Sequence, residues 1–385
     1  MLLANVSIPR SKTLKLGISK TGISLEDWGM LYDTALPCTD EECGVEAMGS
    51  ISRLRLWSGA FVGFYKPGIH EVHTLDPVSR FLYSARSVIL VISAQAAIIA
   101  GLLAICDGRF HFPEFLGVLI GLVVAHMISN LSNDYFGFRS GHDTPDSPRM
   151  RYTIHPLASG VVDRRLFLTG LAILAAIGVA IICAFVIDRG WSAIGFAAGG
   201  LALLVLYDAG PAPLKTIGLG EIATLIVWGP LMIGGGYAMI AGAASPAAFY
   251  ASIPYGIGVM TILTGKHIDQ MSFDAGRGIR TLPVVVGEVT ACRLVAVSLA
   301  AMYLIVALLI LARAITPFAA VVVIAWPRAL AAIRTVTAPR PSAPPAGYIG
   351  WPLWHHRACL MHERLFGWVF ILGLSAGALW SSAFG

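Results

Sequence analysis

Two polar stretches of this 385-residue chain bring carboxylates, basic groups and glycines up against long apolar runs. The first covers residues 133–146 and reads N-D-Y-F-G-F-R-S-G-H-D-T-P-D. The second covers residues 266–280 and contains Lys266, His267, Asp269, Asp274, Arg277 and Arg280. Ionisable groups at membrane depth are costly, so a cluster of them marks a functional site by default. Two such clusters at the ends of separate apolar runs indicate one shared site.

Both stretches are rich in oxygen ligands. Mg²⁺ prefers such hard donors, usually one or two carboxylates per ion together with substrate phosphate oxygens. We expect its ligands among Asn133, Asp134, Asp143, Asp269 and Asp274, with Asp146 as a further loop acid. Phosphate oxygens need cationic partners, and the candidates are Arg139, Arg149, Arg151, Lys215, Lys266, Arg277 and Arg280. A divalent cation between anionic partners, with basic groups at the rim, is typical of a diphosphate site.

A diphosphate site beside hydrocarbon-length segments predicts a substrate with a charged head and an apolar tail. An allylic isoprenyl diphosphate, of farnesyl or geranylgeranyl length, has both features. Loss of its diphosphate leaves a carbocation, which the faces of aromatic rings can stabilise. The aromatic candidates are Tyr135, Phe136, Phe138, Tyr207, Trp228 and Tyr237, and Tyr207 is also a candidate for contact with the diphosphate.

The composition predicts a polytopic membrane protein, because 56% of the residues are hydrophobic and only 13% are charged. A net charge of +5 does not indicate a nucleic-acid partner, since the chain has no basic run of five or more residues. No obligatory protein partner is indicated. The six cysteines are scattered without a C-x-x-C pair, so we expect free thiols; they are Cys38, Cys43, Cys106, Cys183, Cys292 and Cys359.

An all-α bundle of about nine membrane-spanning helices is the predicted fold, because nine apolar runs are long enough to cross a hydrocarbon core of about 30 Å. Their approximate ranges are 81–105, 112–133, 166–187, 191–208, 220–243, 247–265, 290–312, 315–334 and 365–383. Fifteen Lys and Arg residues fall in alternate connections on one face, against Arg109, Arg189 and Arg313 on the other. This asymmetry predicts an N-terminus inside, a C-terminus outside, and a site facing the cytoplasm in the cytoplasmic membrane.

Residues 1–75 form a more polar N-terminal segment without a recognisable targeting sequence. We expect its first forty or so residues to be disordered. Apolar residues then recur at helical spacing, which predicts a short interfacial helix; they are Met48, Ile51, Leu54, Trp57, Phe61 and Phe64.

Three motifs together resemble the UbiA superfamily of intramembrane prenyltransferases, and most of all its branch that prenylates dihydroxynaphthoate in menaquinone synthesis. They are N-D-Y-F-x-F-x-S-G-x-D at 133–143, Y-D-A-G-P-A-P-L-K-T-I-G-L-G-E at 207–221 and D-A-G-R-G-I-R-T-L-P-V-V-V-G at 274–287. The resemblance covers about residues 76–385. It implies a Mg²⁺-dependent helical enzyme with a central cavity open to lipid. It assigns Asn133, Asp143, Asp269 and Asp274 to the metal and diphosphate, and Lys215 and Arg280 to the diphosphate.

The chain departs from this family pattern at two positions. Gly137 stands where the first motif ordinarily has Asp, so the metal site is incomplete unless Asp134 or Asp143 substitutes. Gln270 stands where the second motif ordinarily has an acid, and Asp269 and Asp274 are five residues apart. Five residues on an ideal helix separate two side chains by about 140°. Either the helix breaks near Asp274, or only one of the two acids faces the metal.

With Gly137 in place of the usual Asp, the first motif resembles that of the UbiA-type terpene cyclases. A missing side chain there would leave room for a coiled isoprenoid tail. We therefore expect ionisation of the diphosphate followed by cyclisation of the carbocation. The alternative is transfer of the isoprenyl group to an aromatic acceptor such as dihydroxynaphthoate. A catalytically silent member of the superfamily stays open. A transporter is disfavoured, because the polar residues gather at one face rather than at paired helix breaks near the midplane.

Several histidines have less specific interpretations. His126 lies within an apolar run and is expected to be a packed residue, whereas His267 could be either structural or functional. The group His355, His356, His362 and Glu363 precedes the last predicted span and is expected to lie in an interfacial loop.

Overall fold

The computed structural model describes residues 53–62, 69–346, 348 and 350–384. These residues belong to one unit of the chain, Glu41–Gly385. They contain helices and no strand, which confirms the predicted all-α class. Residues 1–52, with the stretch expected to be disordered and the beginning of the expected interfacial helix, lie outside the described residues.

Among the described residues, nine helical segments are long and apolar enough to cross a membrane, as predicted. A lipid core cannot hydrogen-bond an exposed backbone, so each crossing must satisfy its own amide groups as a helix. The nine are η2 (Ser87–Ile89) with α5 (Val91–Cys106), α6 (Phe112–Arg139), α8 (Arg164–Arg189), α9 (Trp191–Asp208), α10 (Gly220–Ile226) with η4 (Val227–Gly235) and α11 (Gly236–Ala241), α12 (Pro246–Gly276), α14 (Glu288–Leu311), η5 (Pro317–Ala325) with α15 (Trp326–Thr337), and α16 (Trp354–Phe384).

Short helices occupy the connections and the N-terminal part of the described chain. They are α2 (Arg53–Val62), α3 (Ile69–Thr74), α4 (Pro77–Ser84), α7 (Pro148–Tyr152), η3 (Leu214–Thr216) and α13 (Leu282–Val286). Helix α2 falls in the stretch where the interfacial helix is expected. Its position at a membrane surface stays a prediction.

Three helices run farther than the apolar pattern predicts. Helix α6 continues to Arg139, α12 continues to Gly276, and α16 begins at Trp354. The added turns are polar, but many of their side chains are buried against other helices, and hydropathy does not detect such burial. The prediction of an interfacial loop before the last span is therefore wrong, because His355, His362 and Glu363 are buried within α16.

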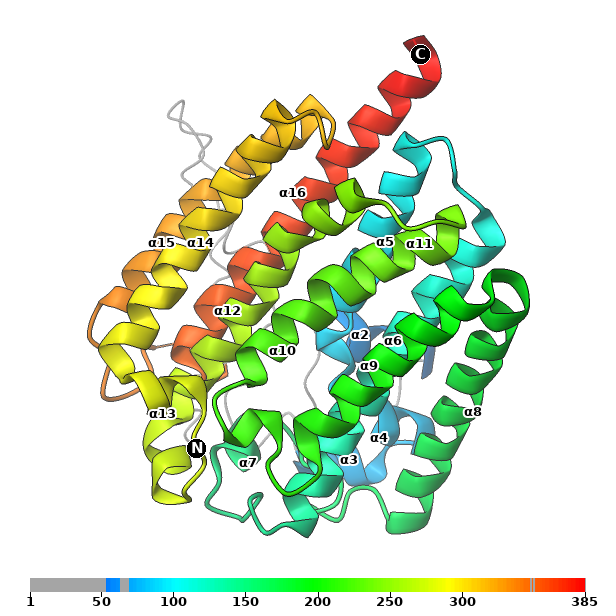
Figure 1. The fold of residues 1–385 in the computed structure, drawn as a ribbon. Coiled ribbons are helices and arrows are strands. Elements are labelled where there is room, and N and C mark those ends of the chain that lie inside the picture. The colour runs from blue at the N-terminus through cyan, green and yellow to red at the C-terminus, as the bar shows by residue number, and fades with distance from the viewer. Residues whose placement is uncertain (1–52, 63–68, 347, 349, 385) are drawn as a thin grey trace, which may run out of the picture. The chain divides into compact units, whose positions relative to one another are not determined.

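Helix α12 packs against α10, η4, α14 and α16 (Figure 1). Small residues on α12 allow these helices to approach closely. A Cβ atom on Gly265 would lie 2.9 Å from the backbone nitrogen of His356 in α16, and one on Gly256 would lie 2.8 Å from the carbonyl oxygen of Leu225 in α10. The two glycines thus fix the distance of α12 from helices on two of its sides.

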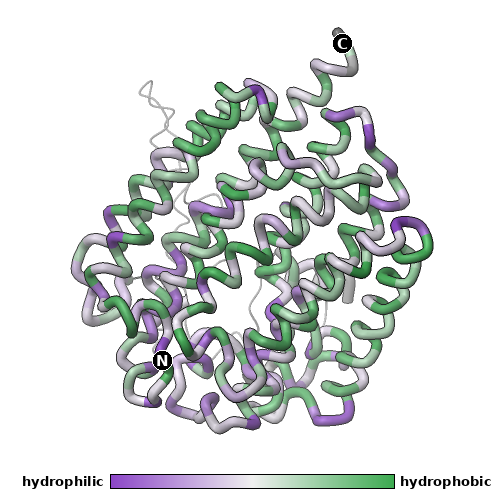
Figure 2. The backbone as a smooth tube through the Cα atoms, viewed as in Figure 1, coloured by the Kyte–Doolittle hydropathy of each residue, from purple (hydrophilic) through white to green (hydrophobic). Residues whose placement is uncertain are grey.

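Helix α8 lies at the outside of the bundle and packs on α6 and α9. It is hydrophobic along most of its length (Figure 2). Large apolar side chains along it are exposed, such as Val179 at 59% and Ile187 at 88%. Exposed aliphatic side chains on a helix of this length fit a surface that faces lipid.

The connections that follow α6, α9 and α12 lie at one end of the bundle, together with α7 and α13 (Figure 1). Hydrophilic segments gather at this end (Figure 2). A backbone hydrogen bond from Arg280 to the carbonyl of Thr216, at 3.1 Å, joins two of these connections. The fold thereby brings both polar stretches of the sequence to the same end of the helices.

Gly265→Ala tests the close packing of α12 on α16. The added methyl group would meet backbone rather than a movable side chain, and overpacking of this kind costs about 1–3 kcal/mol. We expect a lower unfolding temperature of the detergent-solubilised protein. Gly195→Ala in α9 is the matched control, because its Cβ would meet no atom within 4 Å. Equal unfolding temperatures for the two variants would contradict the proposed contact.

Candidate functional site

Asp134 is fully buried near the end of α6 and is paired with two arginines. Arg149 donates from Nε to Oδ1 at 2.9 Å and from Nη2 to Oδ2 at 2.7 Å, and Nη2 of Arg86 lies 3.2 Å from Oδ1. Burial opposes the charge on Arg149, but the Asp134 carboxylate outweighs it and raises the pKa of the guanidinium. Both oxygens of Asp134 are thus engaged by cations. The geometry does not support Asp134 as a metal ligand.

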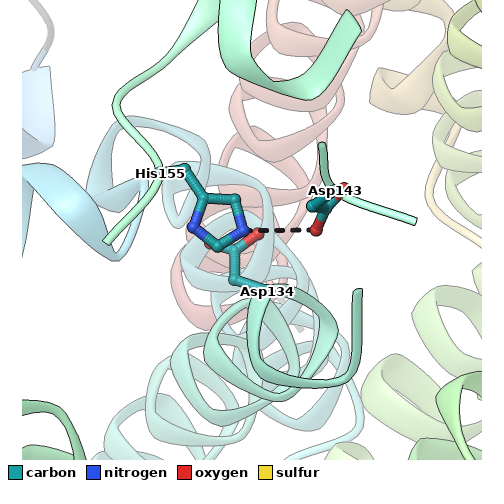
Figure 3. Close-up of side chains that lie close together, drawn as sticks. All are labelled: Asp134, Asp143 and His155. Atoms are coloured by element: carbon teal, nitrogen blue, oxygen red, sulfur yellow. Dashed lines mark hydrogen bonds and ion pairs between the residues drawn. The ribbon is translucent and has the colours of Figure 1, made fainter. Parts of the chain in front are cut away.

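His155 positions Asp143 above the end of α6 (Figure 3). The Nδ1 atom of His155 accepts a hydrogen bond from the backbone of Ala158 at 3.1 Å. Nε2 therefore carries the proton in the neutral ring and donates to Oδ2 of Asp143 at 3.2 Å. Sequence reasoning did not single out His155, which lies outside the two polar stretches.

The carboxylate of Asp143 fills the space beside Gly137. A Cβ atom on Gly137 would collide with this carboxylate, whose Cγ would lie 2.8 Å away. The backbone nitrogens of His142 and Asp143 both donate to the carbonyl of Gly137, at 3.0 and 3.1 Å. The expected room for an isoprenoid tail at Gly137 is therefore absent. Instead, a carboxylate from the following loop stands where the family pattern has an acid on the helix.

Asp134, Asp143 and His155 lie close enough together to suggest a metal centre (Figure 3). Their hydrogen bonds favour a different role. Arg149 engages both oxygens of Asp134, and the His155 nitrogen nearest Asp143 carries a proton. Asp143 alone has a carboxylate oxygen available for a cation. The other two residues hold it and its loop in place.

Asp208 joins the first polar stretch to the connection after α9. Its Oδ1 atom accepts hydrogen bonds from Nδ2 of Asn133 at 2.8 Å and from Nζ of Lys215 at 2.6 Å. Only 2% of the Asp208 side chain is exposed. The sequence contains a signal that could have identified Asp208, because it is an acid that directly ends an apolar run.

A pocket of about 470 Å³ opens beside this group. Its polar lining residues are Ser140, His142, Asp208, Lys215, Thr216 and Arg277, and Phe136 contributes an aromatic ring. Burial and the nearby charge of Lys215 lower the pKa of His142, so its ring is neutral near pH 7. Lys215 and Arg277 are thus the two cations that line the pocket.

Asp269 and Asp274 lie on different sides of α12. The helix is continuous through both residues, so of the two expected possibilities only one acid faces the site. Asp269 accepts hydrogen bonds from the backbone nitrogens of His355 and His356 at 3.1 and 3.0 Å, and lies 2.7 Å from Nδ1 of His355. It caps the N-terminus of α16, where a carboxylate is stabilised by the exposed amides. The geometry does not support Asp269 as a metal ligand.

Asp274 is also buried, but its Oδ2 atom has no hydrogen-bond partner among the described residues. Glu221 at the start of α10 is similar: Oε1 lies 2.7 Å from Nδ1 of His267, and Oε2 has no described partner. A buried carboxylate oxygen without a donor is costly unless a cation or another ligand binds it. The half-buried Lys266 has no ion pair within the described chain. These groups fit a site that takes both a cation and an anion.

The remaining predicted residues are more peripheral. Arg139 and Arg280 are exposed at the polar end, and Tyr207 would lie 3.4 Å from a Cβ atom on Gly220. The hydroxyl of Tyr237 donates to Asp107, after the far end of α5, at 2.5 Å. Tyr237 thus does not belong to this site, in contrast to the prediction.

Mg²⁺ fits the donors that remain available, because they are carboxylate and amide oxygens. Asp274 contributes the unpartnered buried oxygen, Asp143 the oxygen that His155 does not engage, and Asn133 an amide oxygen. These three are the candidate ligands. Asp208 and Glu221 are acids of the same region that sequence reasoning did not assign.

Known proteins resemble the chain in sequence and in fold. The profile of the UbiA prenyltransferase family matches residues 94–355. The chain is 29% identical over 231 residues to 1,4-dihydroxy-2-naphthoate octaprenyltransferase of Escherichia coli, covering 55% of this chain and 70% of that protein. The enzyme of the same description from Bacillus subtilis is 27% identical over 225 residues, covering 57% and 70%. A UbiA homologue from Archaeoglobus fulgidus, solved with GPP and Mg²⁺, shares the fold with a TM-score of 0.51 at 15% identity, covering 78% and 99%.

Proposed function

The chain belongs to the UbiA prenyltransferase family, and from this premise we propose that it transfers an isoprenyl group from an allylic diphosphate to an aromatic acceptor of the dihydroxynaphthoate class. One observation carries the proposal. Asn133, Asp208 and Lys215 come from three elements and meet at a pocket that Arg277 also lines. Acids and cations are thus combined at the polar end of an otherwise apolar bundle, as a diphosphate head with a hydrocarbon tail requires.

In the proposed reaction, Lys215 and Arg277 bind the diphosphate oxygens and Phe136 faces the same pocket. Asn133, Asp143 and Asp274 would hold Mg²⁺, which would neutralise charge on the departing diphosphate. The bond between the allylic carbon and oxygen breaks, and its electron pair leaves with the diphosphate. A ring carbon of the acceptor then bonds to the allylic carbon, and the ring releases a proton. The face of Phe136 can stabilise the positive charge that develops in between.

Transfer is favoured over cyclisation for two reasons. Asp143 occupies the space beside Gly137, so the glycine gives a tail no additional room. The two naphthoate prenyltransferases described above act on an aromatic acceptor. Cyclisation is retained as the second candidate, because glycine at position 137 is the departure that resembles the cyclases.

The assay combines purified protein in detergent, Mg²⁺ and geranyl, farnesyl or geranylgeranyl diphosphate, with and without 1,4-dihydroxy-2-naphthoate. We expect pyrophosphate release and a prenylated naphthoate only when the acceptor is present, and no turnover in EDTA. Asp274→Asn should lower turnover at least about 100-fold, since loss of supporting groups at metal sites already costs 10- to 100-fold. Asp188→Asn is the control, because this partly exposed acid lies at the end of α8 and does not line the pocket. A cyclic hydrocarbon formed without acceptor would instead establish the cyclase.

Substitution of Gly137 separates a need for a carboxylate from a need for space. Gly137→Ala displaces Asp143 without replacing its charge, whereas Gly137→Asp displaces it and supplies a new carboxylate. We expect Gly137→Ala to lower transfer strongly and Gly137→Asp to retain more activity than the alanine variant. The measurement is the rate of product formation at saturating Mg²⁺. If the alanine variant kept full activity, the position of Asp143 beside Gly137 would be irrelevant to catalysis.

We further propose that residues 76–385 form the catalytic membrane domain and that its polar end faces the cytoplasm. The distribution of Lys and Arg supports this orientation. A single cysteine replacing Asp146, in a chain without its native cysteines, should react with an impermeant maleimide only after cells are permeabilised. A cysteine replacing Trp191, at the opposite end of the bundle and 85% exposed, should react in intact cells. The reverse pattern would invert the topology.

A further inference from the structure

The hydrogen bonds of Asp208 leave one of its two oxygens unused. Oδ1 accepts from both Asn133 and Lys215. No described residue donates to Oδ2, although Asp208 lines the pocket. The carboxylate therefore has one oxygen without a described donor, and its other oxygen holds the only lysine that lines this described pocket.

We propose that Asp208 exchanges partners when substrate binds: it holds Lys215 while the pocket is empty, and it binds the divalent cation once the diphosphate has taken Lys215. The inference rests on the proposed function, because it requires a diphosphate in this pocket. It assigns Asp208 as an additional metal ligand and as the group that couples the two binding events.

The small number of available carboxylates in the site favours Asp208 as a metal ligand. At two positions where the family pattern has an acid, this chain has Gly137 and Gln270, and Asp269 caps another helix. Among the predicted acids, Asp143 and Asp274 thus remain with an available oxygen. Asp208 adds a third carboxylate to a site that has lost two.

Electrostatic interactions couple the binding of the diphosphate to the binding of the cation. A diphosphate that approaches without a cation must separate Lys215 from its 2.6 Å partner, and it then lies beside an Asp208 carboxylate that is no longer neutralised. A cation that approaches alone meets a carboxylate already neutralised by that lysine. When both bind, Lys215 contacts the phosphate and the cation replaces it at Asp208. Each ligand thereby removes the obstacle to the other, and the coupling must be reciprocal.

The alternative is that Asp208 only fixes α6 to the connection after α9. The two roles differ in the sign of a measurable effect. If Asp208 is a structural link, its loss disorders Lys215 and weakens diphosphate binding with and without Mg²⁺. If Asp208 exchanges partners, its loss frees Lys215, strengthens binding without Mg²⁺, and reduces the gain that Mg²⁺ gives.

The experiment titrates inorganic pyrophosphate into the full-length protein in detergent by calorimetry, in EDTA and in Mg²⁺. For the wild type we expect Mg²⁺ to tighten binding by about tenfold or more, within the usual range of coupling between sites. Asp208→Asn should bind pyrophosphate several-fold more tightly in EDTA and lose most of the Mg²⁺ gain. Asp208→Glu, which keeps the charge, should retain part of the gain. Asp188→Asn removes a partly exposed acid that does not line the pocket and should leave the Mg²⁺ gain unchanged.

Weaker binding of pyrophosphate to Asp208→Asn in EDTA, or an unchanged Mg²⁺ gain, would overturn the partner exchange while leaving the proposed transferase intact. Unfolding temperatures show whether each variant is folded, and Asp208→Glu carries the test if the asparagine variant is not. Pyrophosphate is released by transferase and cyclase alike, so the result does not depend on the acceptor. A wild-type protein that binds no pyrophosphate with Mg²⁺ would overturn the diphosphate site and the proposed function with it.

Discussion

The buried carboxylate of Asp134 imposes the strongest constraint on the polar end of the bundle. A charge without water must be neutralised by partners, and Arg149 and Arg86 supply them. Arg149 lies in α7, so the ion pair fixes the connection after α6 to the helix it has just left. His155 follows in the same connection and orients Asp143 beside Gly137. The position of Asp143 thus depends on the ion pairs that neutralise Asp134.

The two acids near the end of helix α12 differ in role: one is structural and the other is available to a ligand. Because the helix is unbroken, residues five positions apart face different neighbours. Asp269 satisfies the amides at the beginning of α16, and Asp274 keeps an oxygen without a partner. One carboxylate therefore holds the bundle together and the other is available to a ligand. The same division is seen on α6, where Asp134 is structural and Asn133 contacts the pocket group through Asp208.

A prenyltransferase must bind a highly charged head while keeping a reactive cation away from water. The structure meets both demands by gathering hydrophilic segments with acids and cations at the pocket end of long apolar helices (Figure 2). Near the pocket, opposite charges are paired before any substrate arrives, as in Asp208 with Lys215. Paired groups avoid the cost of isolated buried charges. A diphosphate and its cation can then each replace one partner of such a pair.

The sequence by itself determined the helical fold, the number of crossings within the described chain and the end at which the polar motifs lie (Figure 2). Nine apolar runs predict nine crossings because lipid leaves the backbone no alternative to a helix. It also singled out Asn133, Asp143, Asp274 and Lys215 as candidates, since polar motifs at the ends of such runs are costly to keep. Only the tertiary structure decided which acids are free. Spacing cannot show that α16 begins against Asp269, that Asp143 fills the space at Gly137, or that Asp208 joins Asn133 to Lys215, because each of these contacts depends on how separate helices pack.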